Sequence, residues 1–262
     1  MRKIKAHSLQ KLEYFKKYLE AYLKATNRLP SKCYVDAFAG SGECEIAENR
    51  KKVDGSVMIA LKASRAFDQY VFIEKKKRIF RELNDTIKNS TIDDKRKKSI
   101  ELSRGDCNIL LPKICDKISN MGCLIFLDPE GPELFWKTII SLSKIPKADL
   151  FILYPYDMSL ARLIKNYKEK LDEFYGTDYW QGIYKNRKNA NDAREKLLDF
   201  YISNLKTLGF RFVANKHIRT RLHEGRPLYH LILASHHPVA AKIMSQIFDK
   251  ELDGQMKLKL YP

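Results

Sequence analysis

Cysteine is scarce in this chain of 262 residues, and so is any spacing typical of metal ligands. The five cysteines are at positions 33, 44, 107, 115 and 123. Their odd number and the absence of CxxC spacing argue against a disulfide framework and against a zinc site. The histidines show no metal spacing either, so we predict no bound metal. Cys33, Cys107 and Cys123 lie in or beside apolar segments, which favours reduced, buried thiols in a cytoplasmic protein.

Long apolar runs are also missing. The N-terminal stretch "MRKIKAHSLQKLEYF" has no apolar signal core, and no segment is long enough to cross a membrane. The chain contains no repeats and no low-complexity tracts. Its length and its 44% hydrophobic content suit one core with an appendage, or one large domain.

Acidic residues are in deficit. The chain has 32 Asp and Glu against 49 Lys and Arg, which gives a formal net charge of +17. Such an excess points to an anionic partner, and nucleic acid, either RNA or DNA, is the usual one. A solvated basic surface, or a lysine-rich composition shared by the whole source proteome, is the alternative.

Apolar segments of two kinds alternate along the chain. Short buried runs predict parallel strands, and amphipathic stretches predict the helices between them. The predicted strands are "KCYVDAF", "YVFIEK", "SIELSRGD", "GCLIFLDPEG" and "ADLFILYPYD". After two further helices come "FRFVANKHIR" and "LYHLILASHH", which have no helix between them and therefore predict an antiparallel hairpin.

This pattern predicts an α/β fold: a doubly wound, Rossmann-like sheet of five parallel strands with a closing antiparallel hairpin and helical insertions. S-adenosylmethionine-dependent methyltransferases have this arrangement, whereas dinucleotide-binding dehydrogenases keep the sixth strand parallel. We expect one methyltransferase-like domain over residues 1–262. Its N-terminal helix falls within 1–30, a helical insertion within 157–208, and a C-terminal helix within 239–252.

A glycine-rich turn, "DAFAGSG", follows the first strand. It lacks the third glycine of a dinucleotide fingerprint. Glycines allow close backbone approach to a ligand, and a carboxylate suits the amino-acid end of S-adenosylmethionine. We therefore assign Asp36, Phe38, Gly40 and Gly42 to that cofactor; an ordinary βα turn is the alternative. The residues "ECEIAENRKKVD" that follow are expected to form a loop that covers the cofactor or contacts a substrate.

Two further acids end predicted strands, where ligands bind in open α/β sheets. Glu74 ends the second strand, and a carboxylate there matches the ribose diol. The separation between Asp36 and Glu74 is well above the roughly 20 residues that are usual between a glycine-rich turn and this acid. Asp106 ends the third strand and suits the adenine amino group. We assign Cys107, which follows it, to the same site.

"FLDPEG" ends the fourth strand and predicts the catalytic group. Asp128 would accept a hydrogen bond from a target amine, and Pro129 would fix the turn so that backbone carbonyls do the same. Tyr154 and Tyr156, at the end of the fifth strand, are candidates for stacking on a target base, or else packing residues. In the hairpin loop, Arg219, Arg221 and Arg226 are candidate phosphate contacts; a solvated loop is the alternative.

These motifs together resemble the three-Cys-motif partner proteins. The similarity lies in "YVDAFAGSGE", "FIEK", "GDCN", "FLDPEG" and "PLYHLILASHH" and covers nearly the whole chain. The resemblance implies a class I methyltransferase-like fold and a three-cysteine-motif partner that is similar to radical S-adenosylmethionine enzymes. Glu130 stands where that family carries an aromatic residue in its usual D-P-F-G motif, which puts base stacking at this position in doubt.

Two functional hypotheses follow. The first is a methyltransferase that acts on an exocyclic amine of a nucleobase, with a protein or small-molecule amine as a further possible acceptor. The second is a non-catalytic protein of the same fold that binds nucleic acid or its partner protein. Intact Asp36, Glu74, Asp106 and Asp128 favour the first hypothesis, and Glu130 favours the second.

Overall fold

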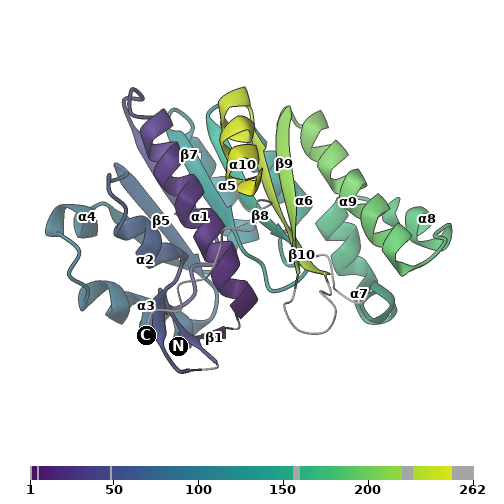
Figure 1. Ribbon diagram of the computed structural model, residues 1–262, viewed down its shortest axis with the longest axis horizontal. Helices are drawn as coiled ribbons and strands as arrows, with labels where there is room; N and C mark the ends of the chain where they lie inside the picture. The colour runs from purple at the N-terminus through teal and green to yellow at the C-terminus, as the bar shows by residue number, and fades with distance from the viewer. Residues whose placement is uncertain (1, 5, 48, 156–159, 220–226, 250–262) are drawn as a thin grey trace.

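A seven-stranded sheet forms the centre of the molecule (Figure 1). The structure is a computed structural model that describes residues 2–4, 6–47, 49–155, 160–219 and 227–249. Its central strands, in spatial order, are β6 (Ile100–Arg104), β5 (Gln69–Glu74), β2 (Lys32–Asp36), β7 (Gly122–Leu127), β8 (Ala148–Tyr154), β10 (Pro227–Ser235) and β9 (Phe212–Arg219).

The first five of these strands run parallel, and β10 is antiparallel to both of its neighbours. The predicted fold class is confirmed, since the two strands of the hairpin close the parallel sheet. The returning strand β10 lies inside, against β8, and β9 forms the edge.

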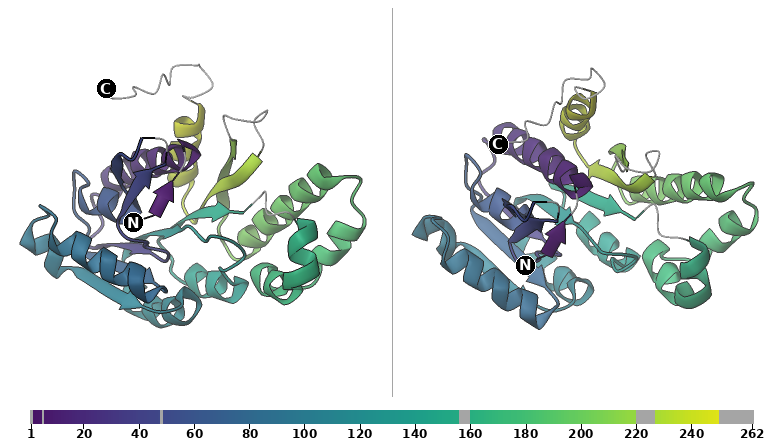
Figure 2. Two further views of the ribbon diagram at one scale, coloured as in Figure 1. Left: turned by 90° about the horizontal axis from the view of Figure 1, so that it is seen from below. Right: turned by 60° about the horizontal axis from the view of Figure 1, so that its bottom comes forward.

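Helices cover both faces of this sheet. They are α1 (Ala6–Ala25), α2 (Ser56–Leu61), α3 (Lys77–Lys88), α4 (Asp94–Lys98), α5 (Cys107–Ile118), α6 (Trp136–Ser143), α7 (Leu160–Tyr175), α8 (Trp180–Lys185), α9 (Ala190–Thr207) and α10 (Pro238–Asp249). Figure 2 shows α7, α8 and α9 gathered at one end of the molecule and α3 and α4 at the other.

Two apolar cores result, one on each face. Helices α5 to α9 contribute buried side chains to one core, and α1, α2, α3 and α10 contribute to the other. Successive strand residues alternate between them: Val35 packs into the first core and Tyr34 into the second. In the second core Phe15 of α1 contacts the rings of Phe126 and Phe151, which fixes α1 across the sheet.

A second, small sheet was not predicted. It consists of β1 (Arg2–Ile4), β3 (Glu43–Ile46) and β4 (Lys52–Asp54), in the order β1-β3-β4. The expectation of a loop after the glycine-rich turn was therefore wrong, and the chain forms a hairpin there. Arg50, with a φ of 55°, and Asn49, whose side chain accepts from the Lys51 amide, shape its turn. The strands are short and charged, and β1 pairs with a segment about 40 residues away, so no local pattern marks them.

Among the described residues, no helix is both long and apolar enough to cross a membrane.

Candidate functional site

A cavity of about 530 Å³ opens at the carboxyl ends of the parallel strands. Its volume falls in the range of small-molecule sites. Residues that follow or end four of the strands line it, together with parts of α3, α5 and α7. The polar and charged members are Ser41, Glu74, Lys75, Lys76, Arg78, Asp106, Asn108, Asp128, Glu130, Glu133 and Lys170.

The glycine-rich turn is held by the strands on either side of it. The Ala37 amide donates to Phe126 of β7 at 3.1 Å, and the Ala39 amide donates to Ile73 of β5 at 2.9 Å. Gly40 has a φ of +61° and lines the cavity, and a Cβ added there would meet nothing within 4 Å. Phe38 lines the cavity as well. The backbone at Gly40 therefore leaves open space for a ligand, as predicted for a glycine that admits close approach.

Gly42 serves a different purpose from the one predicted. It has a φ of +81°, and a Cβ there would meet Leu83 at 3.1 Å and Thr86 at 3.2 Å, both on α3. Its carbonyl accepts from the Gly55 amide at 2.8 Å. Gly42 is thus required for packing against α3, and it is not among the residues that line the cavity.

Asp36 lies beneath the turn rather than in the cavity. Its side chain is fully buried and accepts from the Phe38 amide at 3.2 Å and from the Tyr34 hydroxyl at 3.2 Å. Burial raises the pKa of Asp36 to about 7, hydrogen bonds from Ser56 and Phe38 oppose that rise, and the nearby Asp128 carboxylate adds to it. Asp36 is not among the residues that line the cavity, so the structure places it as a support of the turn rather than as a direct contact of the cofactor.

Glu74 faces the cavity, as predicted. It is 9% exposed, and its two carboxylate oxygens accept from the Gly40 amide at 3.0 Å and the Lys76 amide at 2.7 Å. Each carboxylate oxygen can accept a second hydrogen bond. Glu74 therefore ties the glycine-rich turn to β5 and still offers acceptor capacity toward the cavity.

Asp106 and Cys107 lie beside Glu74. Asp106 caps α5 by accepting from the Asn108 amide at 2.9 Å, and Lys75 donates to it at 2.9 Å. Partial burial raises the pKa of Asp106, but the bonds from Lys75 and Asn108 outweigh this effect and hold that pKa below its usual value. Cys107 is 4% exposed, and burial raises the pKa of its thiol to about 12, so it is a neutral, apolar part of the wall.

Asp128 follows β7 and faces the same cavity. It forms an ion pair with Lys11 of α1, and the two side chains are 13% and 8% exposed. Sequence reasoning missed Lys11, which is 117 residues away. A signal was present, because Lys11, Phe15, Tyr18 and Tyr22 follow one another at helical spacing and therefore share one face of α1.

The loop after Asp128 is fastened by Asn108. Its side chain donates to the Glu133 carbonyl at 2.7 Å and accepts from the Phe135 amide at 2.9 Å. Pro129 is buried and does not line the cavity, so its contribution is to the shape of the turn. Glu130 is exposed and pairs with Lys76 at 2.9 Å across the mouth of the cavity.

The predicted stacking role of Tyr154 is not supported. Its ring is 3% exposed and packs against Phe174 and Tyr201, and its hydroxyl is 2.7 Å from that of Tyr175. It is a core residue, and the helices after β8 cover it. Tyr156, Arg221 and Arg226 lie outside the described residues, as does the side chain of Arg219.

No group of three or more metal-ligating side chains occurs in the part of the chain that the structure describes. No family model matches the sequence, and no curated protein matches it either.

Several solved structures are similar to this chain. Protein LPL1258 from Legionella pneumophila, of family DUF519, is similar with a TM-score of 0.54 and 10% identity over 90% of each chain. The methyltransferase domain of bacterial CtHen1 has a TM-score of 0.46 and 14% identity, over 86% of this chain and 100% of that one. TYW2 of M. jannaschii, in complex with AdoMet, has a TM-score of 0.38 and 13% identity, over 86% and 74%.

Similarity at such low identity concerns the fold alone. The order of the strands, with an antiparallel strand inserted beside the last parallel one, agrees with it. The chain has a Rossmann-like α/β fold whose sheet topology, five parallel strands closed by an antiparallel hairpin, is typical of methyltransferases.

Proposed function

We propose that this chain binds S-adenosylmethionine in the cavity at the carboxyl edge of the sheet and methylates an exocyclic amine of a nucleobase in RNA or DNA. The observation that carries the proposal is that Glu74, Asp106 and Asp128, from the ends of three parallel strands, all open into one cavity beside Gly40. The motifs shared with the three-Cys-motif partner proteins add support, and membership of that family is part of the proposal.

The residues present fit the cofactor. Open space beside Gly40 gives room for a ligand against the backbone. Glu74 would accept from the ribose diol, Asp106 from the adenine amine, and Phe38 and Cys107 would provide apolar contact. When bound, S-adenosylmethionine supplies an electrophilic methyl group on a sulfonium centre.

Asp128 is the group that we assign to the acceptor. An exocyclic amine is a weak nucleophile because its lone pair is delocalised into the ring. A carboxylate that accepts a hydrogen bond from the amine helps that nitrogen to pyramidalise, and it can take the proton that the nitrogen loses. Lys11 fixes the orientation of Asp128 by their ion pair. A carboxylate can accept about four hydrogen bonds, so the bond from Lys11 takes up only part of the acceptor capacity of this group.

Nucleic acid is the substrate that we infer from charge. The net charge of +17 and the cations Lys75, Lys76, Arg78 and Lys170 around the cavity favour a polyanion. The base must leave its stack to reach Asp128. Since Tyr154 is buried, the aromatic side chains available at the cavity are Phe38 and Phe135. Arg219, Arg221 and Arg226 remain the phosphate contacts that we propose for the hairpin loop.

A non-catalytic role is the second candidate, as a binder of nucleic acid or of a three-Cys-motif partner protein. The ion pairs of Asp128 with Lys11 and of Glu130 with Lys76 favour it, because both occupy acidic groups at the mouth of the cavity.

The test is transfer of an isotopically labelled methyl group to RNA and DNA, read by mass spectrometry of the nucleosides. Asp128→Asn should lower the single-turnover rate by roughly 10²–10⁴-fold, the usual size of positioned acid–base assistance. Its cofactor dissociation constant should stay within about tenfold of the wild-type value, because the change affects the acceptor side. Asp116→Asn, an exposed position on α5, is the matched control.

Three outcomes are informative. Label in an N-methylated nucleoside that depends on Asp128 supports the proposal. Cofactor binding without transfer to any nucleic acid supports the non-catalytic role. Undiminished transfer by Asp128→Asn would move the catalytic group elsewhere.

A further inference from the structure

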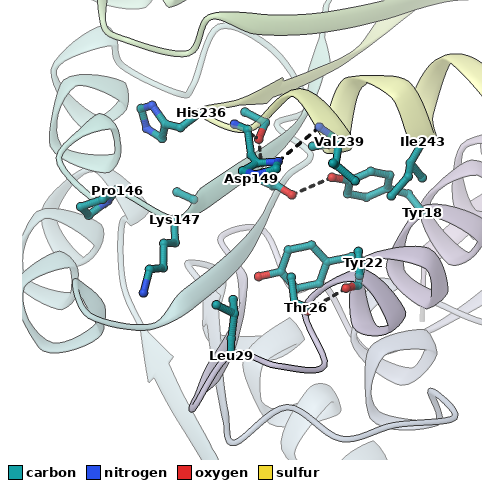
Figure 3. A pocket seen from close by; sticks show the side chains of 15 residues that line it. Tyr18, Tyr22, Thr26, Leu29, Pro146, Lys147, Asp149, His236, Val239 and Ile243 are labelled. Atoms are coloured by element: carbon teal, nitrogen blue, oxygen red, sulfur yellow. Dashed lines mark hydrogen bonds between the residues drawn. The ribbon is translucent and has the colours of Figure 1, made fainter.

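A second cavity, of about 350 Å³, lies at the opposite, amino edge of the parallel strands (Figure 3). It is enclosed by α1, the start of β8, the end of β10 and the start of α10. Its walls are mostly apolar and come from Ala25, Leu29, Pro146, Val239, Ala240 and Ile243. The candidate cofactor site has no residue in common with it.

One carboxylate forms the polar part of this cavity. Asp149 is 9% exposed and accepts from the Tyr18 hydroxyl at 2.7 Å and from the Ser235 hydroxyl at 2.5 Å. Ser235 and Asp149 are register partners of β10 and β8, so the sheet itself fixes the group. Asp149 is the single acidic residue among those that line the cavity.

A buried hydroxyl points into the same space. Tyr22 is 3% exposed, and its hydroxyl has no hydrogen-bond partner within the described part of the chain. Figure 3 shows it directed into the cavity, one helical turn along α1 from Tyr18. Buried hydroxyls are nearly always hydrogen-bonded, so an unpartnered one at a cavity indicates a missing ligand or solvent.

Three basic side chains line this cavity: Lys147, His236 and His237. Lys147 is exposed, and its amino end lies away from the carboxylate in Figure 3. The Nδ1 atom of His236 is 2.9 Å from the Gly209 carbonyl, and the Nδ1 atom of His237 accepts from the Val239 amide at 3.3 Å. Burial raises the pKa of Asp149, and the neighbouring His236 and His237 act in the opposite direction; Asp149 is the one carboxylate among the residues that line the cavity.

We propose that this cavity binds a small organic ammonium ion, an apolar body that carries one primary amine. An ammonium group has three donors, which can reach the Asp149 carboxylate and the Tyr22 hydroxyl oxygen. The rings of Tyr18 and Tyr22, with centroids 6.4 Å apart, provide aromatic faces that attract a cation. The apolar walls cover the rest of the ligand, and the carboxylate disfavours anions.

The probes are three molecules of nearly equal shape: 2-phenylethylammonium, 2-phenylethanol and phenylacetate. Titration of the full chain by calorimetry should show the ammonium ion binding at least about tenfold more tightly than the alcohol, because its hydrogen bonds are charge-assisted. Phenylacetate should not bind. Asp149→Asn, which keeps an oxygen to accept from Tyr18 or Ser235, should abolish the preference for the ammonium ion.

A matched pair of variants tests the contact itself. Tyr22→Phe removes only the unpartnered hydroxyl and should weaken ammonium binding about three- to tenfold, the size of one hydrogen bond. Tyr201→Phe removes an equally unpartnered buried hydroxyl from the core on the other face of the sheet, and should bind as wild type does. Equal affinity for ammonium and alcohol, an unaffected Tyr22→Phe variant, or equal losses in both variants would each overturn the proposal.

Discussion

At the scale of single residues, the acids at the strand ends separate into two groups. Glu74, Asp106 and Asp128 reach the cavity, whereas Asp36 is buried under the turn that it precedes. The sequence predicts that all four lie at one edge of the sheet, because the carboxyl ends of parallel strands meet there. It does not predict which side chain faces the cavity: Asp36 and Glu74 both accept from amides of the turn, and only the path of the folded turn leaves Asp36 beneath it and Glu74 at the cavity.

The buried carboxyl of Asp36 makes stability depend on pH. Its pKa is about 7 in the folded chain and near the ordinary value of about 3.9 in the unfolded chain. Between these values the folded state binds more protons than the unfolded state, so the free energy of unfolding falls as pH rises and then levels off above about 7.

Asp36→Asn should remove this dependence, because asparagine does not titrate. We compare the two proteins by the difference in their free energies of unfolding, variant minus wild type. This difference should rise by an amount of order a few kcal/mol between pH 4 and 7 and stay level above that. Urea unfolding of both proteins across this range measures the difference. The burial of Asp149 also raises its pKa, but that contribution is present in both proteins and cancels. A difference that is flat or falls with pH would contradict the assignment.

Lys11 is far from Asp128 in sequence but pairs with it in the folded chain, so its loss should lower the stability of the fold around the candidate site. Lys11→Met keeps the apolar stem and the helix propensity but removes the cation that Lys11 places beside the Asp128 carboxylate at a site with little solvent. We expect a loss of about 3 kcal/mol in the free energy of unfolding, the usual cost of breaking a buried ion pair.

Lys16→Met, at an exposed position of the same helix, is the control and should change the free energy of unfolding little. Adding Asp128→Asn to Lys11→Met should recover part of the loss, because the negative charge that Lys11 offsets is then removed as well. Equal stabilities of the two lysine variants would show that the ion pair does not matter in solution.

At the scale of elements, the sequence predicts the alternation of strands and helices well, because strands buried on both faces are short, continuously apolar runs, whereas the helices between them are apolar at helical spacing. The failures have a common cause. The hairpin β3-β4 and its partner β1 are short and charged, and they pair through a contact distant in sequence. The structural roles of Gly42 and Gly55 cannot be predicted from the sequence for the same reason, because each role is set by a residue that is distant in sequence.

Gly55 is the most sensitive position of this arrangement. It is the N-cap of α2, and a Cβ there would come within 2.8 Å of the Gly42 carbonyl oxygen, which is backbone and cannot rotate aside. Gly55→Ala should lower the free energy of unfolding by about 1–3 kcal/mol through overpacking. It should also weaken cofactor binding, because the glycine-rich turn must shift.

Gly182 provides the matched control. It lies within α8, and a Cβ there would meet nothing within 4 Å, so Gly182→Ala should raise the free energy of unfolding by about 0.5–1 kcal/mol. Thermal or urea unfolding of both variants measures these opposite shifts. Two shifts of the same sign would contradict this account of Gly55.

At the scale of the whole molecule, one sheet presents two separate cavities at its opposite edges. Helix α1 contributes side chains near both cavities: Lys11 pairs with Asp128 at one cavity, and Tyr18 and Tyr22 line the other. The sequence predicts the first cavity, because glycines and acids in fixed positions mark it. The second has no motif. It arises only when residues of α1, β8, β10 and α10 are brought together by the closing hairpin.

We propose above that the cavity at the carboxyl edge binds S-adenosylmethionine through Glu74. Calorimetric titration of the wild type, Glu74→Gln and Glu82→Gln with this cofactor tests it most directly. Glutamine keeps one oxygen, which can accept from either the Gly40 or the Lys76 amide, and it removes the charge that faces the ribose. We predict saturable binding by the wild type and by Glu82→Gln on the surface of α3, and an affinity roughly tenfold to hundredfold lower for Glu74→Gln. No binding by the folded wild type at millimolar cofactor, or equal affinity in all three proteins, would contradict the account.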